Sequence, residues 1–132
     1  MEQHQKNTFA IAKWLQKQPR VKYVLYPGLE NHPGYVINKA QTTGFGGMIS
    51  FAVDNAETAR QILEGIKLIK FAESLGGTES LITYPIRQTH TDLTAEECAE
   101  KGITDCLLRF STGIEATQDL IDDLAQAFAV IE

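Results

Sequence analysis

Short connections between apolar segments constrain the fold of this chain more than any other feature. The second half contains three candidate strands, at residues 67–72, 81–84 and 106–111. Parallel neighbours in a sheet are usually joined by a crossover of about a dozen residues or more. The connections between these last strands are too short for that, so we expect a mixed, largely antiparallel sheet.

Periodicity and turn signals define the remaining elements. Strands are expected at 21–26 and 48–53, where the second alternates small residues with bulky apolar ones. Helical spacing of apolar residues, together with end signals, predicts helices at 2–18, 35–40, 56–65, 95–100 and 117–130. The pair Asp54-Asn55 offers a cap for the third helix, Thr94 and Glu97 have the spacing of a capping box for the fourth, and Thr117 can cap the last. The prediction is a single α+β domain over residues 1–132, with helices covering one face of the sheet.

The overall charge excludes some partners. The 132 residues are 43% hydrophobic and carry a net charge of −5, with no basic stripe. This balance disfavours nucleic acid or an anionic membrane as the main partner. No apolar run approaches the roughly 20 residues of a membrane helix, and the polar N-terminus lacks a signal peptide. We therefore expect a cytoplasmic protein, with Cys98 and Cys106 reduced.

Arg109 is a charged residue at an unexpected position, inside one of the predicted strands. It lies in an otherwise apolar strand, on the same face as Leu107 and Ser111. An arginine in such a strand needs a partner, and its guanidinium can hold a carboxylate by two parallel hydrogen bonds. The partner can be Glu115 or Asp105, giving a structural ion pair, or it can be the carboxylate of a ligand. Both interpretations stay open.

Residues 71–80 form a second candidate site. The segment follows an apolar strand and places Glu73 and Ser74 shortly before Gly76 and Gly77. Glycines permit a tight turn, and polar residues at the mouth of such a turn often bind ligands. An ordinary turn between two strands is the alternative.

Other chemistries are disfavoured. The segment 44–47 (GFGG) precedes a strand and lacks the helix N-terminus that binds phosphate in phosphate-binding loops. The histidines lie in three separate regions without metal-ligand spacing, and the cysteines are too far apart for a CxxC site. His90 is interpreted as a hydrogen-bonded loop residue.

Two long motifs resemble one enzyme family. The first is 72–81 (AESLGGTESL), followed by Pro85 and the pair 89–90 (TH). The second comprises 102–105 (GITD), 108–111 (LRFS) and 113–115 (GIE), and upstream segments such as 26–29 (YPGL) and 44–47 also fit. Together they are similar to the C-terminal signature of the pyridoxal-phosphate (PLP)-dependent trans-sulfuration, or Cys/Met metabolism, enzymes. These are cystathionine γ-synthase, γ-lyase and β-lyase, and methionine γ-lyase.

The resemblance implies a role for each residue of the candidate site. The chain would correspond to the small C-terminal domain, the last third of a fold-type I PLP-dependent transferase. Arg109 and Ser74 would hold the α-carboxylate of a sulfur amino acid, and Leu75 would belong to the same substrate-binding segment. Glu73 would face the distal end of the substrate, where an acidic residue resembles cystathionine-handling members. No catalytic or cofactor-binding residue is implied in this chain.

The resemblance also implies what lies elsewhere. The Schiff-base lysine and the phosphate-binding residues of the family belong to a larger PLP-binding domain that matches no part of residues 1–132. The complete enzyme would be a homotetramer that uses PLP for β- or γ-elimination or replacement. This chain alone is expected to bind no covalent cofactor and to be inactive. The alternative is a stand-alone module for amino-acid carboxylates, or the partner of a separately encoded PLP-binding domain.

Overall fold

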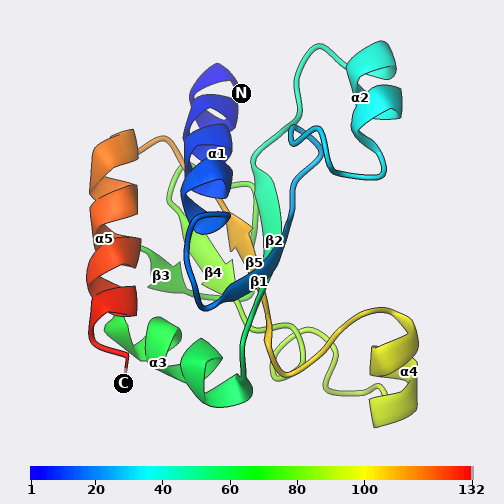
Figure 1. The fold of residues 1–132 in the computed structure, drawn as a ribbon, viewed down its shortest axis with the longest axis vertical. Coiled ribbons are helices and arrows are strands. Elements are labelled where there is room, and N and C mark those ends of the chain that lie inside the picture. The colour runs from blue at the N-terminus through cyan, green and yellow to red at the C-terminus, as the bar shows by residue number, and fades with distance from the viewer. Residues whose placement is uncertain (132) are drawn as a thin grey trace.

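The computed structural model describes residues 1–131 and contains a five-stranded sheet with helices packed on one face (Figure 1). Helices α1, α3 and α5 pack on that face, whereas α2 and α4 lie in connections at two ends of the molecule. In chain order the elements are α1 (Glu2–Leu15), β1 (Val21–Leu25), α2 (Tyr35–Gln41), β2 (Met48–Val53), α3 (Ala56–Gly65), β3 (Lys70–Phe71), β4 (Leu81–Thr83), α4 (Ala95–Glu100), β5 (Leu107–Ser111) and α5 (Thr117–Ala129). The predicted α+β class is confirmed.

The sheet is mixed and mostly antiparallel, as the spacing of the strands predicted. Its strand order is β1-β2-β5-β4-β3, and only the β3–β4 pair is parallel. Strand β5 lies in the centre, with Arg109 opposite Ser50 of β2 and opposite Thr83 of β4. The arginine is therefore held in the middle of the sheet.

The parallel pair corrects one expectation about short connections. Lys70 lies opposite Leu81 and Phe71 opposite Ile82, although only residues 72–80 join the two strands. No crossover helix is needed, because the connection reaches across β4 to contact β5 and then returns. The Gly76 N–H donates a hydrogen bond to Ser111 Oγ of β5 at 2.8 Å, which marks this excursion.

Strand β3 is also shorter than predicted, spanning Lys70–Phe71 rather than 67–72. The side chain of Asp123 on α5 accepts hydrogen bonds from the backbone N–H groups of Lys67, Leu68 and Ile69, at 2.8, 2.9 and 2.8 Å. These three donors are thus satisfied by a helix-borne carboxylate, and the segment does not join the sheet until Lys70.

The main core lies between the sheet and the helices. In β2 and β5 every second residue faces the helices, and Ile49, Phe51, Leu108 and Phe110 are completely buried. Three helices each add an apolar stripe to this core. The stripes are Ile11 and Leu15 of α1, Ala59 and Ile62 of α3, and Leu120 and Leu124 of α5. The alternation predicted for β2 is confirmed, and it leaves Arg109 on the opposite face.

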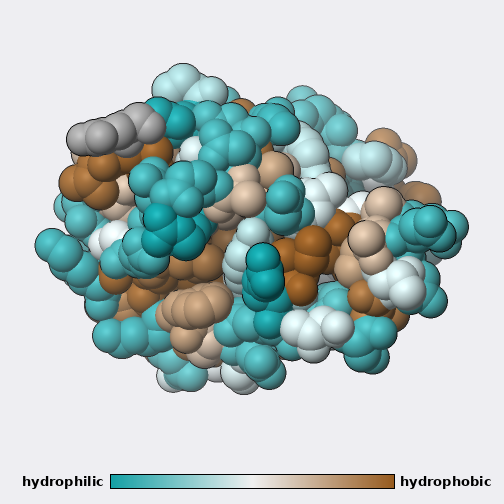
Figure 2. Space-filling view, turned by 90° about the horizontal axis from the view of Figure 1, so that it is seen from below, coloured by the Kyte–Doolittle hydropathy of each residue, from teal (hydrophilic) through white to brown (hydrophobic). Residues whose placement is uncertain are grey.

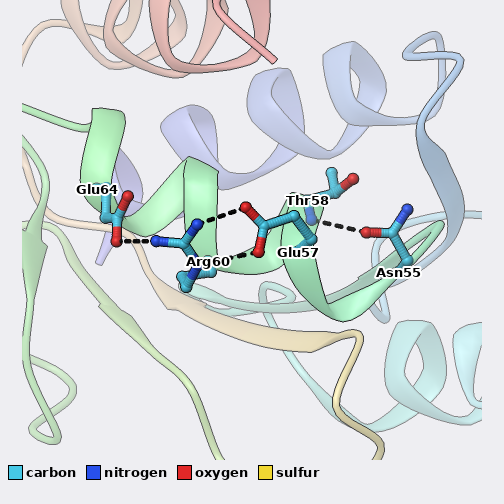
Figure 3. A network of polar contacts seen from close by, with 5 residues as sticks. All are labelled: Asn55, Glu57, Thr58, Arg60 and Glu64. Carbon is cyan, nitrogen blue, oxygen red and sulfur yellow. Dashed lines mark hydrogen bonds and ion pairs between the residues drawn. The ribbon is translucent and has the colours of Figure 1, made fainter. Parts of the chain in front are cut away.

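Two of the three predicted helix caps are confirmed, whereas α1 ends at Leu15, before the predicted residue 18. Asn55 Oδ1 accepts the Thr58 N–H at 2.9 Å, beside the surface ion pairs of Arg60 with Glu57 and Glu64 (Figure 3). The capping box at the start of α4 is present. The expected cap by Thr117 is wrong. That residue is the first of α5, and its hydroxyl donates to Asn7 Oδ1 of α1 instead.

On the face seen in Figure 2 hydrophilic side chains predominate, and apolar ones lie in separate patches. Leu68 and Phe71, at the sheet edge, are 40% and 50% exposed. Among residues 1–131, the helices are all too short or too polar to cross a membrane.

Candidate functional site

Arg109 faces away from the helix-packed core, in the centre of the sheet. Its neighbours Leu108 and Phe110 are buried on the helix side, so the alternation of β5 directs Arg109 to the other face. Its partners in register, Ser50 and Thr83, are small and leave room for the long side chain. Arg109 is half-buried there.

The guanidinium of Arg109 has few partners of its own. Nη2 donates to the Glu73 carbonyl at 3.3 Å, a long hydrogen bond, and Nε is buried without a hydrogen-bond partner. Within residues 1–131, no carboxylate lies within ion-pair distance of it. A buried, unpartnered N–H on a permanently charged group is costly, and no internal carboxylate among the described residues compensates for it.

The two carboxylates that could have formed a structural ion pair are engaged elsewhere. Glu115 accepts hydrogen bonds from Ser80, and Asp105 Oδ1 accepts one from the Cys106 thiol at 3.3 Å. The structural ion pair considered from the sequence is therefore wrong.

Residues 73–76 lie against the same face of β5 and are tied to it at both ends. The Glu73 carbonyl accepts from Arg109, and the Gly76 N–H donates to Ser111 Oγ, two residues further along the strand. Gly76 has a φ of +78°, which confirms the predicted turn. The structure thus brings the backbone of Glu73 to Arg109. The residues between the two ties, Ser74 and Leu75, are exposed, Leu75 by 53%.

The end of this connection is held by a contact between Ser80 and Glu115 that the sequence interpretation did not include. Ser80 donates its backbone N–H and its hydroxyl to the two oxygens of Glu115, both at 2.7 Å. Its hydroxyl oxygen accepts the Gly113 N–H at 2.8 Å. Ser80 was noticed only as part of a family motif, and Glu115 was considered as a partner of Arg109. No local pattern shows that a serine and a carboxylate 35 residues apart will meet.

The thiols and histidines do not form a competing site. His90 Nδ1 lies 2.7 Å from Thr89 Oγ1, as expected for a loop histidine. Both cysteines are free, and burial, assisted by Asp105, raises the pKa of the Cys106 thiol. A raised pKa disfavours the reactive thiolate. In the part of the chain that the structure describes, no cluster of ligating side chains could hold a metal ion.

The larger hollows of the surface lie away from Arg109. One of about 400 Å³ lies between α1 and the stacked rings of Tyr35 and Phe45, and another of about 510 Å³ lies beside Arg60 and Tyr84. We place the candidate site at Arg109 because it has the unpartnered cationic donor.

Comparison with known proteins gives one consistent result. The family model described as "Cys/Met metabolism PLP-dependent enzyme" matches residues 1–129. The chain is 52% identical to cystathionine gamma-lyase of Dictyostelium discoideum over 96% of its length, and 50% identical to cystathionine gamma-synthase of Haemophilus influenzae over 98%. It also superposes on the structure of cystathionine gamma synthase from Xanthomonas oryzae pv. oryzae in complex with cystathionine, with a TM-score of 0.91, 43% identity and 99% coverage. The chain spans about a third of each of these proteins, namely 33%, 31% and 35%.

Proposed function

Because the chain belongs to the family of Cys/Met metabolism PLP-dependent enzymes, we propose that it supplies the substrate-carboxylate side of such an active site. The reaction would be of the cystathionine γ-lyase, γ-synthase or β-lyase type. The chain would be the C-terminal domain, and a larger PLP-binding domain would complete the site. On the same resemblance, the complete enzyme is proposed to be a cytoplasmic homotetramer.

The buried, unpartnered Nε of Arg109 is the observation that carries this proposal. A guanidinium offers a planar fork of N–H donors, and a carboxylate is the ligand that it holds by two parallel, charge-assisted hydrogen bonds. No internal carboxylate occupies this position within residues 1–131. An amino-acid substrate would bring the missing anion.

The neighbouring segment would supply the other contacts. Ser74 follows directly after the residue whose carbonyl contacts Arg109, so its exposed hydroxyl can offer a further donor to the same carboxylate. The exposed Glu73 side chain would face the distal end of the substrate, where a carboxylate favours a ligand with a second ammonium group. Cystathionine has such a group, since it carries two amino-acid ends.

The lysines of this chain do not fit a covalent PLP site. Every lysine is exposed to solvent, whereas a lysine that forms a Schiff base is normally activated by desolvation or by a nearby charge. This supports the proposal that the cofactor is anchored by the part of the longer enzyme that the chain does not cover. The role of this chain would be to bind and orient the substrate.

The proposal is tested by titrating the chain with L-cystathionine in calorimetry or NMR experiments. Replacement of Arg109 by Ala is expected to weaken binding by about 10- to 100-fold, the usual effect of a charge-assisted hydrogen bond. Arg109→Lys keeps the charge but loses the planar fork of donors, so its affinity should lie between those of the wild type and Arg109→Ala. Arg87→Ala removes an exposed arginine and is the matched control.

Two outcomes would contradict the proposal. Equal binding by the wild type and Arg109→Ala would remove Arg109 from the site. Cystathionine cleavage or Schiff-base absorbance, with PLP added to this chain alone, would show that the cofactor site lies here. Tight binding without any activity, even when the remainder of a relative is supplied, would favour a stand-alone carboxylate-binding module.

A further inference from the structure

We infer that Glu115 is a positioning residue for the substrate-binding segment 73–76, and that it acts through Ser80. The inference rests on the proposed function, because it concerns the same site. Glu115 itself makes no hydrogen bond or ion pair with Arg109. Its effect is on the shape of the connection that carries Ser74.

The contact between Glu115 and Ser80 is strong and involves both carboxylate oxygens. Oε1 of Glu115 accepts the Ser80 N–H and Oε2 accepts the Ser80 hydroxyl, each at 2.7 Å. Ser80 is only 1% exposed, so water competes little for either donor. Hydrogen bonds to an ionised acceptor are shorter and stronger than neutral ones, and two of them fix both the backbone and the side chain of Ser80.

Ser80 is the last residue before β4, so its position fixes one end of the connection 72–80. The turn at 113–115 supports the connection further. The Ile114 N–H donates to the Thr78 carbonyl at 2.9 Å, and Gly113 lies so close that a Cβ there would be 2.2 Å from the Thr78 oxygen. The stretch that remains exposed, Glu73 to Gly76, is therefore held between Arg109, Ser111 and this turn.

Helix α1 holds Glu115 in turn. The completely buried Asn7 donates from Nδ2 to the carbonyls of Gly113 and Glu115, at 3.1 and 2.8 Å. The Asn7 Oδ1 accepts from Gln3 and Thr117. The Glu115 backbone is thus attached to a helix of the main core, and its carboxylate transmits that fixed position to Ser80.

The same contact keeps Glu115 away from Arg109. Both Glu115 oxygens are occupied by Ser80 donors, so Glu115 is not a partner for Arg109. Glu115 thus shapes the segment 73–76 and takes no part in neutralising the arginine.

Amide hydrogen exchange of the chain tests the inference. Glu115→Gln can accept only one of the two Ser80 donors and presents an NH₂ group to the other. We expect exchange at Ser80 and Gly76 to become about tenfold faster. Exchange at Val53, which donates to Cys106 in the sheet, should stay within about twofold of the wild-type rate.

Three further variants make the result specific. Ser80→Ala should accelerate exchange at Gly76 similarly, and combining it with Glu115→Gln should add little, because both changes remove the same contact. Glu100→Gln, an exposed residue of α4, removes the same charge and should change nothing. Equal acceleration at Val53 and Gly76 would indicate general destabilisation and would overturn the inference.

L-Cystathionine titration of the same variants connects positioning to binding. Glu115→Gln is expected to weaken binding about tenfold with Arg109 intact. Faster exchange without any loss of affinity would overturn the role of Glu115 in the site. If the wild type itself fails to bind, the proposed function fails, and the exchange rates alone still decide whether Glu115 holds the segment.

Discussion

Removal of the Asp123 carboxylate is expected to destabilise the fold by about 3 kcal/mol. Asp123 is 6% exposed and accepts three consecutive backbone N–H groups of the segment that leads into β3. In Asp123→Ala the Ile69 donor is left buried, at about 2 kcal/mol, whereas the Lys67 and Leu68 donors lie nearer to solvent, at about 0.5 kcal/mol each. The predicted loss follows from these three donors.

Asp123→Asn should cost less, about 1 kcal/mol. Its amide oxygen can take the place of Oδ2, which serves Leu68 and Ile69, so only the Lys67 donor and Gln126 face the new NH₂ group. The Gln126 amide keeps its orientation, because its Nε2 also donates to the Gly65 carbonyl. Asp122→Asn, on the exposed side of α5, is the control and should stay within about 0.5 kcal/mol of the wild type.

Urea unfolding followed by the fluorescence of Trp14 measures these differences. Trp14 of α1 packs edge-to-face on Phe128 of α5, at 5.5 Å between ring centroids, so it reports the packing of the helix that carries Asp123. A loss below about 1 kcal/mol for Asp123→Ala would refute the reasoning, since the buried donor alone accounts for more. Equal losses for Ala and Asn would show that the effect is not one of hydrogen-bond acceptors.

Two further predictions concern Tyr26 and Gly113. Burial raises the pKa of Tyr26 to about 12. The unfolded chain releases this proton near pH 10 while the folded state keeps it, so stability should fall from pH 10 to 12, by about 3 kcal/mol in full. Tyr26→Phe should abolish this drop in urea unfolding, and an unchanged drop would exclude Tyr26 as its source. Gly113→Ala should cost about 2–3 kcal/mol in thermal unfolding, because its Cβ would press on the Thr78 carbonyl. Gly46→Ala, where φ is +80° and no atom lies near, should cost only about 1 kcal/mol, and the reverse order would contradict the steric argument.

Elements with local signals could be predicted from the sequence almost to the residue. Strand β2 matches its alternating pattern, α3 begins after the Asn55 cap, and α4 follows the capping box of Thr94 and Glu97. In each case the residues that decide the boundary lie within a few positions of it. Alternation also gave the face of Arg109, because the period of a strand is fixed by its geometry.

Features set by distant residues could not be predicted in the same way. The start of β3 depends on Asp123, more than 50 residues away, and a carboxylate on a helix carries no sign of the backbone that it will cap. The Thr117 hydroxyl donates to the buried side-chain amide of Asn7, 110 residues earlier, instead of capping its own helix. These hydrogen-bond partners depend on which polar groups are buried away from water when the core packs.

The candidate site combines a motif that is visible in the sequence with a contact between distant residues that is not. The motif around Arg109 was visible in the sequence, and so was the choice between an internal and an external carboxylate. The choice is decided against the internal partners by Ser80, whose two donors occupy the oxygens of Glu115. A cation that keeps one N–H buried and unsatisfied is unfavourable for the isolated fold, and the cost falls when an anion arrives. This explains why Arg109 can remain unpaired here: the stability lost at Arg109 would be recovered on binding the carboxylate that we propose as its ligand.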